Sequence, residues 1–269
     1  MPLDLQSPPW WQWALLIPCL AVLYYLLHRG LRLESTGPPR MRWGLADFLV
    51  GVLLLVVVHQ SAASGVLYLG DLPLLPRGWA IGAAVVVAGA LTSLVVLLWA
   101  SQLGLPGAVL GLFYPRLPRN VLSTVLACLS FLAPCWIVTW AWVRLIAALG
   151  HTPTVQAVLE VYLNAWAGDD RSEMVAIGLG AVLAAPLAEE LVFRGFIFGM
   201  LREGMGASGA LLVSSAAFAA FHWQPEVLVP LFLVGLVLNL IYLRTGCLAY
   251  SILFHALFNG ATLALGPRL

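Results

Sequence analysis

The sequence predicts an all-α polytopic membrane protein with about eight transmembrane helices. Of its 269 residues, 62% are hydrophobic and 9% are charged, whereas a soluble domain is about 45–50% apolar and about 25% charged. Eight spans of about 20 residues each would occupy roughly 60% of the chain, close to this apolar fraction. The high apolar and low charged content excludes an ordinary soluble protein and a nucleic-acid-binding protein, and the formal net charge is only +1.

Breaks rich in Arg, Pro, Gly and acidic residues separate the apolar runs. The spans are predicted at about 10–28, 45–67, 79–101, 121–149, 173–203, 208–222, 226–244 and 247–265. A short interfacial helix is expected over 154–166. The loops after the first, third, fifth and seventh spans hold eight of the 13 basic residues, and the positive-inside rule then places both termini outside the cytoplasm.

Polar side chains inside the spans concentrate in the last hundred residues. An ionisable residue within a membrane span is costly and points by default to a functional site. The fifth span contains two glutamates and an arginine, the sixth ends on a histidine, and the eighth contains a histidine and an asparagine. These residues are Glu189, Glu190, Arg194, His222, His255 and Asn259.

Helix geometry separates the two adjacent glutamates of the fifth span. Glu190 and Arg194 are four residues apart, so they share a helix face and can form an ion pair. Glu189 is rotated by about 100° from Glu190, and its partner must therefore come from another helix. Pro186 lies three residues before Glu189 and is expected to kink or loosen the helix.

The estimated depths of the four polar residues in the membrane are compatible with a single site. At a rise of 1.5 Å per residue, Glu189 and His222 each lie about 21 Å from the turn between the fifth and sixth spans. His255 and Asn259 share a face of the last span, about 12 and 18 Å from the turn that precedes it on the same side of the membrane. All four groups can therefore lie in one slab of the membrane.

Three motifs on successive spans together resemble the CPBP family, which is also called the Abi family and includes CAAX prenyl endopeptidases and bacterial bacteriocin-processing and self-immunity proteins. The motifs are E-E-x-x-x-R from Glu189 to Arg194, F-x-x-x-H from Phe218 to His222, and H-x-x-x-N from His255 to Asn259. The resemblance covers about residues 173–265. It divides the chain into N-terminal helices with about four spans over 1–170 and a catalytic helical core with about four spans over 171–269.

The resemblance implies a metal-independent intramembrane glutamate endopeptidase that needs no cofactor. Glu189 and His222 would activate a water molecule, and His255 and Asn259 would stabilise the oxyanion. The expected partners are membrane lipids and a peptide or membrane-protein substrate that can carry a lipid group. We expect a multi-pass protein of the bacterial cytoplasmic membrane.

The remaining motif positions have supporting roles in this interpretation. Glu190 and Arg194 would form a buried ion pair, because an arginine at that depth is too costly without a partner. Phe218 would contribute packing. A carboxyl group in a low-dielectric site, such as Glu189, becomes a better base near neutral pH, which agrees with the role implied for it.

Other functions stay open at this point. Glu189, His222 and His255 could bind Zn²⁺ or a similar ion, although the sequence has no H-E-x-x-H motif of a zinc protease. A transporter could use the same residues as a proton relay. A non-catalytic immunity or scaffold protein could keep buried polar residues as interhelical contacts.

Overall fold

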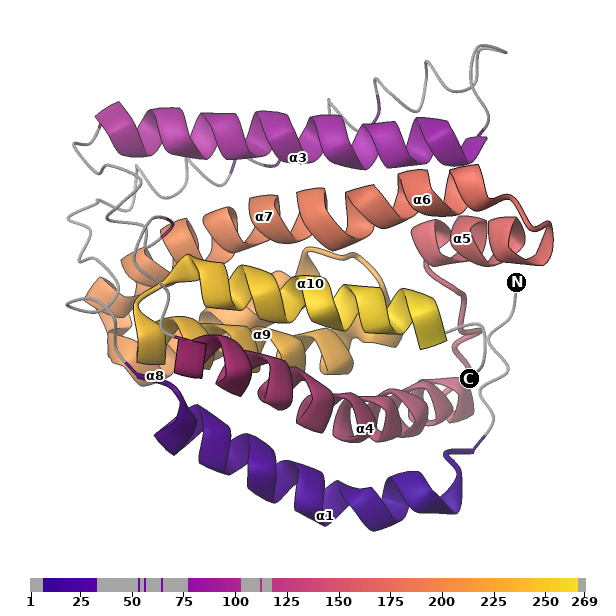
Figure 1. The fold of residues 1–269 in the computed structure, drawn as a ribbon, viewed down its shortest axis with the longest axis horizontal. Coiled ribbons are helices and arrows are strands. Elements are labelled where there is room, and N and C mark those ends of the chain that lie inside the picture. Colours follow the sequence, from indigo (N-terminus) through magenta and orange to yellow (C-terminus); the bar gives the residue numbers. More distant parts are fainter. Residues whose placement is uncertain are drawn as a thin grey trace.

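The computed structural model describes residues 7–32, 53, 56, 64, 77–102, 112 and 118–265. These residues form helices and turns and contain no β-strand, which confirms the predicted all-α class. In Figure 1 the helices run side by side, with α3 along one side of the molecule and α1 along the other.

The first helices agree with the predicted spans. They are α1 (Trp10–Tyr25) with a π-helical turn η1 (Leu26–Gly30), α3 (Arg77–Gln102) and α4 (Pro118–Ala148). α1 packs against α4 (Figure 1). The span predicted at 45–67 falls outside the described residues, apart from three isolated positions.

A short helix, α5 (Ala157–Ala167), occupies the place of the helix expected over 154–166. It packs on the next helix, α6 (Arg171–Leu179), where Tyr162, Ile177 and Leu263 form a small buried cluster. The side chain of Asp170 caps α6 by accepting a hydrogen bond from the Glu173 N–H. This hydrogen bond, together with one from the Ser172 hydroxyl, lowers the pKa of Asp170 below its ordinary value.

One long helical segment runs from Arg171 to Ala220. After α6 it comprises the π-helical turn η2 (Gly180–Ala184), α7 (Ala185–Glu190), the π-helical η3 (Leu191–Phe198) and α8 (Gly199–Ala220). At Gly206 the backbone leaves the helix, with φ 74° and ψ 175°, a conformation that glycine adopts without a steric penalty. The segment therefore contains two predicted spans, 173–203 and 208–222, joined at the expected turn.

The chain ends in a helical hairpin. A 3₁₀ turn, η4 (Pro225–Val227), leads into α9 (Leu228–Thr245), and α10 (Leu248–Leu265) follows. Gly246 ends α9 in the left-handed conformation at φ 66°, as a C-terminal glycine does. The described residues contain six segments long and apolar enough to cross a membrane, and the broken segment is counted once among them. The predicted number of about eight is therefore approximate.

The outer helices present apolar side chains outward. Trp10 and Ile17 on α1 are 79% and 78% exposed, and Leu122 on α4 is 60% exposed. Such side chains suit a lipid environment, which has no water to exclude them. In contrast, the main buried core surrounds α9, α10 and η3. The polar residues of the C-terminal motifs lie within this inner part of the helix bundle.

Candidate active site

A buried ion pair joins the second glutamate of the first motif to its arginine. The Arg194 Nη1 donates to Glu190 Oε1 at 2.9 Å, and both side chains are fully buried. This is the contact expected from their spacing of four residues. The pair neutralises two charges that would be costly to bury separately.

The Arg194 guanidinium is also held by α9. Its Nε donates to the Asn239 Oδ1 and its Nη2 donates to the Gly235 carbonyl, each at 3.2 Å. The Asn239 amide in turn donates to the Ser215 hydroxyl at 3.0 Å. Sequence reasoning missed Asn239, although an asparagine in the middle of an apolar span was a visible signal.

Phe218 packs at the centre of the cluster. The Arg194 Cζ lies 4.6 Å from the centroid of its ring, within the range of a cation–π interaction. The same ring contacts the imidazoles of His222 and His255 edge to face, with centroids 5.1 and 5.7 Å apart. The Phe218 ring thus contacts the buried guanidinium and both histidine rings.

His255 connects the two glutamates. Its Nδ1 lies 2.8 Å from Glu190 Oε1, and its Nε2 lies 3.7 Å from Glu189 Oε2. Glu190 Oε1 therefore accepts from both Arg194 and His255. The carboxylate at Glu190 requires a proton on the His255 Nδ1, so the Nε2 is the atom turned toward Glu189.

His222 approaches the same oxygen of Glu189 from α8. Its Nε2 lies 4.0 Å from Glu189 Oε2. Its Nδ1 lies 2.9 Å from the Phe218 carbonyl, four residues earlier, and a carbonyl can only accept, so the Nδ1 carries a proton. The spacing of the second motif thus fixes which nitrogen of His222 faces Glu189.

Asn259 lies one turn beyond His255 and contacts the irregular part of the glutamate helix. Its amide donates to the Ala181 carbonyl at 2.8 Å. That carbonyl lacks a helical donor, because the Ala185 N–H bonds to Gly180 instead and Pro186 has no N–H. Pro186 therefore loosens the helix as expected, and Asn259 satisfies the acceptor that results.

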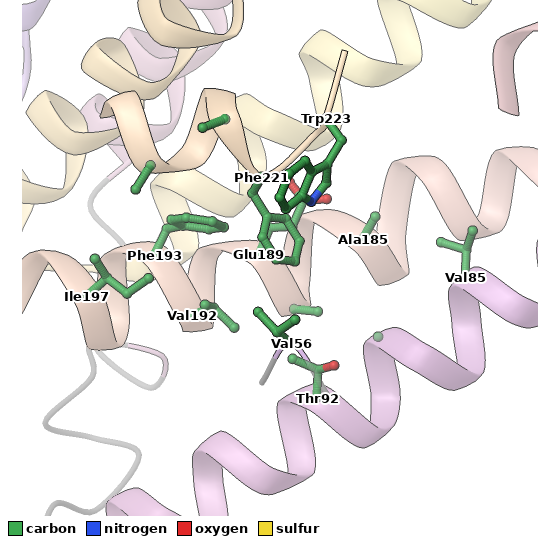
Figure 2. A pocket seen from close by; sticks show the side chains of 14 residues that line it. Val56, Val85, Thr92, Ala185, Glu189, Val192, Phe193, Ile197, Phe221 and Trp223 are labelled. Atoms are coloured by element: carbon green, nitrogen blue, oxygen red, sulfur yellow. The ribbon is translucent and has the colours of Figure 1, made fainter. Parts of the chain in front are cut away.

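An apolar cavity of about 280 Å³ opens beside Glu189. Figure 2 shows Glu189, Val192 and Phe193 on one wall and Val85 and Thr92 of α3 on another. Among the described residues of the lining, Glu189 is the one charged residue, and its side chain is 21% exposed. The remaining lining residues are Val56, Gly89, Ala185, Ala188, Ile197, Ala217, Ala220, Phe221 and Trp223.

The cluster is a pair of imidazoles directed at one carboxylate oxygen. The structure brings Glu189, His222 and His255 together, with Glu190 and Arg194 behind them. Among the residues that the structure describes, no group of three or more His, Cys, Asp or Glu side chains has the arrangement of a metal site. Chemically, such a cluster can position a water molecule and transfer protons.

The segment that contains these polar residues matches a known protein family. Residues 171–261 match the Rce1-like family, described as type II CAAX prenyl endopeptidase Rce1-like. This segment is thus similar to the CAAX protease family. The match confirms the resemblance predicted from the three motifs, and it supports, at the family level, a CAAX-protease-like intramembrane endopeptidase. No curated protein and no solved structure matches the chain.

Proposed function

We propose that the protein is an intramembrane endopeptidase in which Glu189 and His222 activate the water that cleaves a peptide bond. The observation that carries this proposal is the position of Glu189 Oε2, which lies 4.0 Å from His222 Nε2 and 3.7 Å from His255 Nε2. These separations are too long for direct hydrogen bonds. They suit a shared water molecule or a reacting group bound between them.

Water activation would begin with proton transfer to Glu189. The carboxylate takes a proton from the water while its oxygen attacks the peptide carbonyl carbon, and the carbonyl becomes an oxyanion. His222, with its proton on Nδ1, offers a lone pair on Nε2 that orients the same water. Glu189 then returns the proton to the leaving amine, so the carboxylate is regenerated after each cleavage.

The oxyanion would be stabilised by His255 and Asn259. Because Glu190 holds the Nδ1 proton of His255, the Nε2 can donate only when the imidazole is a cation. The described cluster contains two glutamates and one arginine, an arrangement that accommodates a positively charged donor in this role. Asn259 uses one amide hydrogen on Ala181 and retains a second for the oxyanion.

The family match and the cavity support a proposal for the substrate class. The matched family is described as a prenyl endopeptidase, and the cavity beside Glu189 is almost entirely apolar. We therefore propose a membrane-associated peptide as the substrate, with or without an attached lipid. Its scissile bond would lie at Glu189, and an adjacent apolar group would enter the cavity.

A cleavage assay tests the proposed function. Purified protein in lipid-containing micelles is incubated with an internally quenched farnesylated CAAX-type peptide and with the same peptide carrying an unmodified cysteine. Cleavage of either peptide supports an endopeptidase, and the ratio of the two kcat/KM values reports the contribution of the lipid. If neither peptide nor a pool of apolar peptides is cleaved, the transporter and scaffold interpretations gain support.

Chelators are expected to leave cleavage unchanged. In the proposed mechanism the carboxylate and the imidazole activate water without a Lewis acid. The measurement is activity after treatment with EDTA or phenanthroline, together with metal analysis of the purified protein. Inhibition that added Zn²⁺ reverses would contradict the proposal and favour a zinc site.

Replacing Asn259 by Ala is expected to lower kcat by about 10²-fold or more with little change in KM, because an oxyanion donor acts mainly in the transition state. Asn259→Asp is expected to be worse, since it places negative charge where negative charge develops. The measurement is single-turnover cleavage normalised to the folded fraction. Normalised turnover near that of the wild type in both variants would mean that Asn259 only satisfies the Ala181 carbonyl.

A further inference from the structure

Helix α3 forms one wall of the cavity although it lies outside the segment that matches the family. Val85, Gly89 and Thr92 of α3 line the cavity, and their spacing of four and three residues places them on one helix face. α3 also packs closely on the glutamate helix. A Cβ atom added to Gly89 would lie 3.0 Å from the Ala184 carbonyl oxygen, so the position of this wall is tightly constrained.

The hydroxyl of Thr92 has no partner in the described structure. Thr92 is 3% exposed, and its Oγ1 makes no hydrogen bond. Three other helical threonines satisfy their hydroxyls locally: Thr139, Thr245 and Thr262 each donate to the carbonyl four residues earlier, at 2.8–2.9 Å. This local bond is available in a helix, yet Thr92 does not make it. Thr124 of α4 and the neighbouring Ser93 also lack a partner, but neither lines the cavity. Thr92 is therefore distinguished by its place in the cavity wall.

A buried polar atom without a partner is unfavourable in the free protein. It becomes favourable only when a ligand supplies the missing hydrogen bond. Thr92 and Glu189 line the same cavity from different helices (Figure 2). A chain that lies against Glu189 would therefore pass the Thr92 hydroxyl, which is the natural donor for a carbonyl oxygen in an otherwise apolar environment.

We infer that Thr92 is a substrate-binding residue that determines specificity, with its hydroxyl donating to a carbonyl oxygen of the peptide bound beside Glu189. The inference rests on the proposed endopeptidase function and assigns a role to the N-terminal half of the chain. Thr92 takes no part in proton transfer. Its hydroxyl strengthens the binding of a ligand that has a main-chain carbonyl at this position. A purely hydrocarbon ligand binds less well, because it leaves the hydroxyl unpaired.

The test compares three variants of the full chain. Thr92→Val removes the hydroxyl and keeps the shape, whereas Thr92→Ser keeps the hydroxyl. Ser93→Ala is the matched control, because Ser93 is the next residue of α3, is 8% exposed and also has an unpaired hydroxyl, but does not line the cavity. Each variant is measured for cleavage of the farnesylated CAAX-type peptide and for thermal stability in micelles.

Thr92→Val is expected to raise KM and lower kcat/KM by about tenfold, the loss of one hydrogen bond, while kcat changes little. Its thermal stability should equal or exceed that of the wild type, because an unsatisfied buried group is removed. Thr92→Ser should retain the wild-type KM, and Ser93→Ala should leave KM and kcat unchanged. A destabilised Thr92→Val variant, an unchanged KM, or an equal effect of Ser93→Ala would overturn the inference.

A binding measurement separates this inference from the proposed function. The fluorescein-labelled farnesylated peptide is titrated into the Glu189→Gln protein with and without Thr92→Val. A roughly tenfold weaker Kd with Thr92→Val supports the substrate contact, whether or not Glu189 is the base, and an equal Kd contradicts it. Cleavage by Glu189→Gln itself would overturn the mechanism and leave the Thr92 comparison intact. If the peptide binds neither protein, the inference is overturned, because a substrate-binding residue requires a bound peptide.

Discussion

Replacing Glu189 by Gln is expected to lower the rate of peptide cleavage by about 10⁴-fold, at the upper end of the range for general base catalysis. The amide keeps the size of the side chain but cannot take a proton from water. Glu189 faces two imidazole Nε2 atoms at 3.7 and 4.0 Å, and no other described carboxylate has this environment. The measurement is single-turnover cleavage by purified protein.

Glu203→Gln is the matched control for this change. Glu203 lies on the same helical segment and is exposed, near the break at Gly206, so the variant removes the same charge without touching the cluster. It should cleave at the wild-type rate. Both variants are expected to extract and migrate as the wild type does. Activity of Glu189→Gln within a few-fold of the wild type would mean that another group activates the water.

The apolar runs were sufficient to predict most of the fold. α1, α3, α4, α9 and α10 begin and end within a few residues of the predicted spans, because a membrane helix needs a long apolar stretch and its ends collect turn residues. The turn near Gly206 was predicted from the same pattern. The span at 45–67 stays a prediction, since it lies outside the described residues.

Local spacing predicted those parts of the cluster that depend on one helix. The contact between Glu190 and Arg194 follows from a separation of four residues. The sequence also indicated that Glu189 needed a partner from another helix, and the depth estimate brought His222 and His255 to its level. The roles of these residues in catalysis stay predictions until the variants are measured.

The contacts that the sequence could not predict are those that depend on how the helices are packed. The Asn239 side chain on α9 contacts Arg194 on η3, and nothing in the local sequence of Asn239 specifies this partner. Asn259 donates to Ala181 only because a π-helical turn precedes Pro186 and leaves that carbonyl free. Thr92 borders the cavity because α3 packs closely on the glutamate helix, a tertiary contact without a sequence motif.

Removal of one member of the buried ion pair is expected to give the largest loss of stability. Breaking a buried pair costs about 3–5 kcal/mol, because the remaining charge loses its partner. Glu190→Ala should be worse than Arg194→Ala, since Glu190 Oε1 accepts from both Arg194 and His255. After Arg194→Ala, Glu190 keeps its contact with the His255 Nδ1 at 2.8 Å. The measurement is thermal unfolding in micelles.

The Glu190→Ala, Arg194→Ala double variant separates a true pair from two independent contributions. If the residues interact, the double variant is less destabilised than the sum of the single variants, because neither charge is left unpaired. Arg171→Ala is the control, since the Arg171 side chain is 87% exposed and 3.6 Å from an equally exposed Asp169, and little change is expected there. Additive losses would contradict the pair. The double variant should still lose activity, because its recovered stability does not restore the carboxylate that orients His255 toward Glu189.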